Sequence, residues 1–116
     1  MSYSLSFVQL FEPTVLTNAA ATIFTAPATP ANQILSNGRM RFTNTSNATQ
    51  AVTAYAVPVA GTAGPGNCFL NGESVAANNH IDVDIPVLKA GEFLQAFAGN
   101  ASDVTVFALA GTLIAQ

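Results

Sequence analysis

The sequence predicts an all-β protein, an antiparallel β-sandwich of seven to nine short strands. Three observations carry this prediction. Apolar and polar residues alternate with a period of two along several segments, and clusters of Gly, Pro, Asn and Ser interrupt them roughly every ten residues. No segment sustains the i, i+3, i+4 apolar pattern of a surface helix. With 116 residues, half of them hydrophobic, the chain has the size of a single domain, residues 1–116, built around one core.

The N-terminal residues 1–12 show the first alternation, in which Tyr3, Leu5 and Phe7 are separated by serines. This pattern is typical of an edge strand of the sandwich, and equally of an arm that leaves the domain and pairs with a neighbouring subunit. Both interpretations remain open. The next segment, residues 15–21, has moderate helical propensity, but no apolar stripe continues it, so we expect at most one helical turn there.

Two strands are expected in the middle of the chain. In residues 39–44 the apolar side chains Met40 and Phe42 alternate with polar ones, which predicts a half-buried strand that ends in a turn. Residues 51–57 are rich in β-branched and aromatic residues, and neither face of this strand is strongly polar. We therefore expect both faces to be covered, and Pro58 to end the strand.

The clearest strand in the second half is residues 80–85, where three branched aliphatic residues alternate with three polar ones. Two short strands, residues 68–70 and 73–75, are predicted on either side of a tight turn at Asn71 and Gly72. The last predicted strands are residues 93–98, 104–109 and 112–115, separated by breaks at Gly99–Asn100 and at Gly111.

The inward positions of these strands predict the core. It is expected to contain Met40, Phe42, Ile81, Val83, Ile85, Phe93, Val104 and Val106. The eight phenylalanines are all expected there: Phe7, Phe11, Phe24, Phe42, Phe69, Phe93, Phe97 and Phe107. The single cysteine, Cys68, excludes an intramolecular disulfide and is expected to be a small buried apolar residue.

Charge is scarce, because Asp, Glu, Lys and Arg make up only 8% of the residues and the formal net charge is −3. Such scarcity of charge implies either a surface of hydroxyls and amides or, as we favour, a surface largely covered by partners. The three basic residues are too few to bind nucleic acid. No apolar stretch has the length of a membrane span, so no membrane partner is expected. The first ten residues lack the basic start of a signal peptide, which predicts synthesis in a cytoplasm.

Four charged side chains could form a site. His80, Asp82 and Asp84 lie on one strand face, but two carboxylates on a strand do not supply the six or more oxygens of a calcium site, so no metal is expected. Instead, we expect either a solvated strand face or a cross-strand charge ladder in which Asp82 and Asp84 meet Arg39 and Arg41, which are also at alternate positions of a strand.

No catalytic constellation is recognised. The only thiol couple available is Cys68 with His80, and an apolar strand does not supply the electropositive surroundings that activate a thiol. The nucleophile-elbow pattern Gly-x-Ser-x-Gly does not occur. The sequence therefore predicts no catalytic residue, no cofactor and a protein that is not an enzyme.

Several phrases along the chain carry a family resemblance: FVQL near the start, then TIFTAP, RMRFTNTS, AYAVP, NCFLN, HIDVDIP, LKAGEFLQAFA and VTVFALAG. Together they resemble small virion proteins of tailed bacteriophages, of the capsid decoration or cement type. The resemblance implies a jelly-roll sandwich, a homotrimer, a place in the virion, and the major capsid protein or other virion proteins as partners. The alternative is a tail-associated module that binds a host-surface carbohydrate or another virion protein. Head and tail locations are not distinguished, and no functional residue is carried over.

Overall fold

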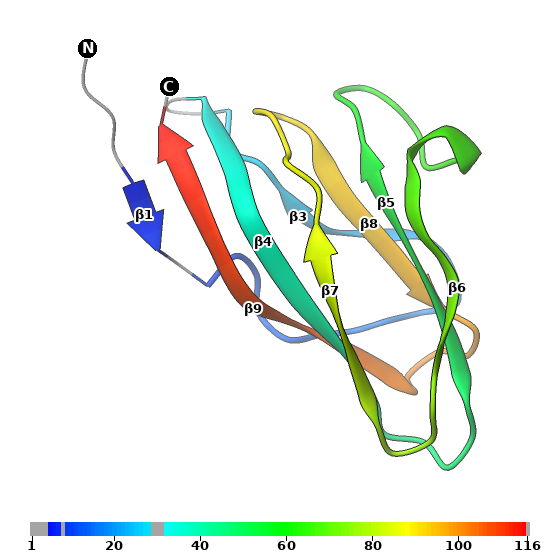
Figure 1. The fold of residues 1–116 in the computed structure, drawn as a ribbon. Helices are drawn as coiled ribbons and strands as arrows, with labels where there is room; N and C mark the ends of the chain where they lie inside the picture. Colours follow the sequence, from blue (N-terminus) through cyan, green and yellow to red (C-terminus); the bar gives the residue numbers. More distant parts are fainter. Residues whose placement is uncertain (1–4, 8, 29–31, 116) are drawn as a thin grey trace.

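The computed structural model describes residues 5–7, 9–28 and 32–115, which form two antiparallel sheets (Figure 1). The first sheet contains β1 (Leu5–Phe7), β2 (Thr14–Val15), β4 (Gln33–Asn44), β7 (His80–Ile85) and β9 (Val104–Ala115). The second contains β3 (Ala21–Thr25), β5 (Gln50–Val57), β6 (Cys68–Val75) and β8 (Phe93–Ala98). One short 3₁₀ turn, Pro65–Asn67, precedes β6. The predicted antiparallel β-sandwich is confirmed, and these residues form no α-helix.

Strand pairing is nested along the chain. The hydrogen-bonded pairs β5–β6, β4–β7, β3–β8 and β2–β9 follow one another outwards, like the two arms of a single long hairpin. The hairpin is folded over, so that β9 also pairs with β4 in the first sheet and β8 with β5 in the second. β1 stands outside this nesting, because it pairs with the C-terminal half of β9 while β2 pairs with the N-terminal half.

The core lies between the two sheets, where the inward positions of the strands meet. Fully buried side chains there include Leu35, Met40, Phe42, Val52, Ala54, Leu94, Ala96, Val104 and Val106. Leu10, Phe11 and Leu16, on either side of β2, complete the same cluster. The segment that leads into the second strand is therefore anchored by its side chains as well as by its backbone.

The expected core needs correction for aromatic residues. Phe93, Phe97 and Phe107 are half-buried and lie outside the core cluster, because Leu94, Ala96 and Val106 occupy the inward positions of their strands. Ile81 and Val83 pack against the core but are only partly buried. Cys68 is also half-buried rather than enclosed. Tyr3 and the side chain of Phe7 lie outside the described part of the structure.

Two predicted breaks are absent. β6 runs continuously through Asn71 and Gly72, where the register shifts and Gly72 has φ of 63°, so the positive φ forms a bulge within an edge strand rather than a turn. β9 likewise runs through Gly111 without interruption. The prediction that Pro58 ends the fifth strand is confirmed, since β5 stops at Val57.

A buried amide holds one end of the sandwich together. Asn44, at the end of β4, is 1% exposed. Its Nδ2 donates to the carbonyl oxygens of Ala48 and Val75 at 2.8 and 3.0 Å, and its Oδ1 accepts from the backbone N–H of Ser46 at 2.9 Å. The side chain thus links the β4–β5 loop to the end of β6, so this end is positioned by specific hydrogen bonds as well as by packing.

Candidate functional site on the outer sheet faces

The outer face of the first sheet carries four of the charged side chains. The pairing of β4 with β7 places Arg41 opposite Asp82 and Arg39 opposite Asp84. Arg41 donates from Nε to Asp82 Oδ1 at 2.7 Å and from Nη2 to Oδ2 at 3.1 Å. Arg39 Nε lies 3.8 Å from Asp84 Oδ1, and the Asp84 side chain is 92% exposed. The structure thus brings all four residues together, with one bidentate pair and one loose pair.

The bidentate hydrogen bonds shift the pKa values of both Arg41 and Asp82. The hydrogen bond from Arg41 lowers the pKa of Asp82 below its ordinary value, and the positive charges of Arg41, Arg39 and His80 act in the same direction. The same hydrogen bond raises the pKa of Arg41. The pair therefore remains ionised throughout the neutral range and joins β4 to β7 at the protein surface, where such a pair contributes little to stability.

Apolar side chains lie beside this ladder on the same outer face. Phe107 on β9 is directly opposite Arg41 and is half-buried. Val15 on β2 and Leu109 on β9 are 55% and 43% exposed. The face therefore changes from apolar along β2 and β9 to charged along β4 and β7.

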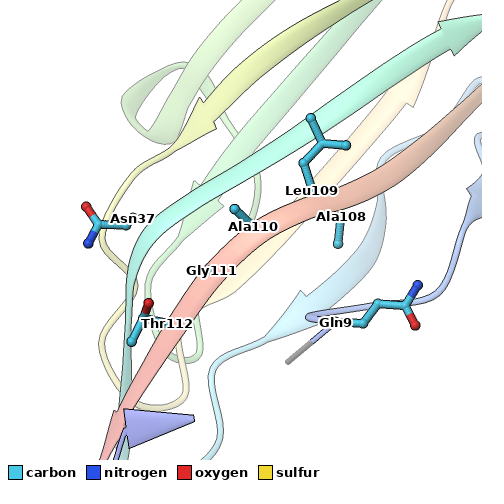
Figure 2. A pocket seen from close by; sticks show the side chains of 7 residues that line it. All are labelled: Gln9, Asn37, Ala108, Leu109, Ala110, Gly111 and Thr112. Carbon is cyan, nitrogen blue, oxygen red and sulfur yellow. The ribbon is translucent and has the colours of Figure 1, made fainter. Parts of the chain in front are cut away.

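An open groove of about 590 Å³ crosses this face at a bulge in β4 (Figure 2). Asn37 adopts φ of 55° there, and the register between β4 and β9 shifts between Ser36 and Arg39. Figure 2 shows the side chains of Gln9 and Asn37 on opposite sides of β9, whose run Ala108–Thr112 lines the groove. Sequence reasoning missed this feature; the Asn37–Gly38 pair, which favours positive φ, was its signal.

The outer face of the second sheet has a different composition. Its outward residues are Thr22, Thr25, Thr53, Tyr55, Val57, Phe93, Gln95 and Phe97, which we call the uncharged face. The rings of Tyr55 and Phe97 stack with centroids 6.2 Å apart. Gln95 Nε2 donates to Thr22 Oγ1 at 3.0 Å, which joins β8 to β3 across the middle of the face. Sequence reasoning assigned both phenylalanines to the core, because apolar residues occupy both sides of β8.

The other residues considered for chemistry do not converge. Cys68 begins β6 in the second sheet, whereas His80 begins β7 in the first. Among residues 5–7, 9–28 and 32–115, no group of three or more His, Cys, Asp or Glu side chains could hold a metal ion. In the same part of the chain, no helix is long and apolar enough to cross a membrane.

Comparisons with known proteins define the fold of this chain but no family. No family model matches it, and no curated protein matches its sequence. Two solved structures of infectious bursal disease virus are similar over 97% of the chain: the Gx strain structure, with a TM-score of 0.50 and 15% identity, and the T13 viral particle, with 0.51 and 10%. The chain spans about a third of the length of each of those chains. At such identity the likeness concerns the β-sandwich fold alone.

Proposed function

We propose that this chain is a non-enzymatic structural protein of a bacteriophage virion, a capsid decoration (cement) protein that stabilises the shell through subunit contacts. The observation that carries the proposal is the contrast between the two sheet faces, one with a charge ladder and one with aromatic side chains and no charge. Surfaces depleted in charge and enriched in aromatic residues are typical of the centres of protein interfaces. The sandwich likeness to a viral particle protein and the resemblance to phage virion proteins support the same role.

The topology supports a jelly roll as the form of this sandwich. Jelly rolls contain eight strands in two sheets. The four nested pairs from β2–β9 to β5–β6 supply eight strands in that arrangement, and β1 is additional. An additional strand at a sheet edge is free to take a second role.

We assign that role to association. In the structure β1 pairs with β9 of its own chain through three residue pairs, from Leu5–Ile114 to Phe7–Thr112. Because every copy presents the same β9 edge, β1 can pair with a neighbouring copy in the assembled state. The buried side chains Leu10 and Phe11 hold the rest of the N-terminal segment in the domain. The proposed arm therefore ends before Leu10, slightly short of the expected boundary at residue 12.

The proposed partners are further copies of this chain, in a homotrimer, and the major capsid protein or another virion protein. The chain would be made in the host cytoplasm and act in the virion. Cementing requires many weak contacts that act together, since a subunit tethered at one contact has a high local concentration for the next.

The test is addition of the purified chain to phage shells that lack it, followed by gradient sedimentation. Saturable binding at a fixed number of copies per shell, with a raised temperature of shell disruption, is the expected result. Saturable binding without any change in shell stability would remove the cement role, and no binding would remove the decoration role altogether.

A second candidate is a tail-associated module that binds a host-surface carbohydrate. A depression of about 290 Å³ on the second sheet, lined by Tyr55, Pro65, Cys68 and Asn71, favours it, because an aromatic ring beside an amide is suited to a sugar. Tyr55→Ala should then abolish binding to a host glycan. A glycan array measures this directly.

A further inference from the structure

The uncharged face combines three half-buried aromatic side chains with a lack of charge. Glu73 is the only charged residue within its four strands, and it pairs with Val52, whose side chain is in the core. Because paired residues share one side of a sheet, Glu73 lies on the side opposite the uncharged face. The remaining charges lie on the first sheet, in loops, or before β2.

The uncharged face is also preordered. Thr53 and Val57 occupy outward positions, yet they are buried. Thr53 is directly opposite Phe97, and Val57 is directly opposite Phe93. Thr53 Oγ1 also accepts a hydrogen bond from the backbone N–H of Gly72 at 3.1 Å, and the Tyr55–Phe97 stack orders the two rings before any partner arrives. A preordered aromatic surface loses little side-chain entropy on association.

We infer that the uncharged face is covered by a second copy of this chain. Charge favours this contact between copies, because two chains that each carry a net charge of −3 repel one another least when they meet at a face without acids. The ladder on the opposite side of the sandwich then remains in solvent.

The dimensions are also compatible. Four strands about 4.8 Å apart and about six residues long cover roughly 400 Å² in projection. A standard interface buries roughly 800 Å² of accessible surface per partner, so the face and its flanking loops can supply it. The inference rests on the proposed self-assembly, but it concerns the isolated protein and needs no shell.

The test places one charge at the centre of the face. Gln95 lies at the centre of the face, because it is paired with both Thr22 and Tyr55. Gln95→Glu is nearly isosteric, and it would bring like charges together in the oligomer. The matched control is Thr105→Glu, an outward, half-buried position on the first sheet. Sedimentation equilibrium of each protein between about 1 and 100 μM, with melting curves to verify folding, measures the association.

We expect the wild type and Thr105→Glu to associate, and the dissociation constant of Gln95→Glu to rise at least about 30-fold with little change in melting temperature. Gln95→Lys alone should associate as weakly as Gln95→Glu. Mixing the two variants should restore association, because opposite charges then meet. A wild type that is monomeric at 100 μM, or equal behaviour of Gln95→Glu and Thr105→Glu, overturns the inference. A monomer that still binds shells would refute the inference while the decoration proposal stands.

Discussion

Leu10 occupies the space that a side chain at Gly111 would need. A Cβ at Gly111 would lie 2.6 Å from Leu10 Cδ1 and 2.9 Å from Leu10 Cγ. The segment before β2 can cross β9 at this point only because the residue beneath it has no side chain.

Gly111→Ala should therefore destabilise the domain by about 1–3 kcal/mol, the usual range for overpacking a well-packed site. Urea unfolding of the two proteins measures the difference. Gly66→Ala is the control, since a Cβ at Gly66 has no atom within 4 Å. Adding Leu10→Ala to Gly111→Ala should give less destabilisation than the two single changes summed. Strict additivity would show that the two side chains do not compete for this space.

Asn44→Ala should lower the free energy of unfolding by about 2–4 kcal/mol, because it removes one buried amide and leaves several backbone groups without their partner. The neighbouring exposed Asn47 provides the control, and Asn47→Ala should change stability by less than about 0.5 kcal/mol. Thermal or chemical unfolding distinguishes them. Equal effects of the two substitutions would mean that the network around Asn44 does not stabilise this end of the sandwich.

Asp82 should contribute to stability in a pH-dependent way. Its pKa is lower in the folded protein than the ordinary value of 3.8, so its contribution is present above that pH and is lost as pH falls through the lowered pKa. Melting temperatures of the wild type and Asp82→Asn should therefore converge in acid and differ near neutrality. An NMR titration that gives Asp82 an ordinary or raised pKa would contradict the expectation.

The proposed exchange of β1 can be captured by a disulfide. In a Cys68→Ser background, Phe7→Cys and Thr112→Cys together place two thiols at paired positions of β1 and β9. Oxidised oligomers should give covalently linked chains on a non-reducing gel, because the thiols of different copies are paired. Cross-linked monomers alone would show that β1 is the edge strand of its own sandwich, even in the assembly.

Much of the fold was predictable from local pattern. The alternation in residues 80–85 and 39–44 leads directly to β7 and β4, and the outward positions of those strands lead to the Arg41–Asp82 pair. The alternation of residue types along a strand does not reveal which side faces inward when both sides are apolar. For this reason Phe93 and Phe97 were assigned to the core, and the uncharged face was missed.

Glycine was the other source of error. In a sequence, glycines such as Gly72 and Gly111 are typical of strand ends. In the structure Gly72 lies in a bulge of β6 and Leu10 packs against Gly111, so both strands continue through their glycine. Both explanations depend on residues far away in the sequence or on the partner strand. Strand lengths in the second half of the chain could therefore not be predicted from local pattern.

The nested pairing also implies an order of events during folding. β5 and β6 are consecutive strands joined by residues 58–67, whereas β2 and β9 are separated by all the other strands of the nesting. Closing a longer loop costs more entropy, so each pair that forms shortens the effective loop for the next one outwards. Such a chain should fold slowly, in milliseconds to seconds, from the β5–β6 hairpin towards its ends. β9 completes the first sheet and follows all the other strands along the chain, so folding of the sandwich during synthesis can finish only after residues 104–115 have left the ribosome.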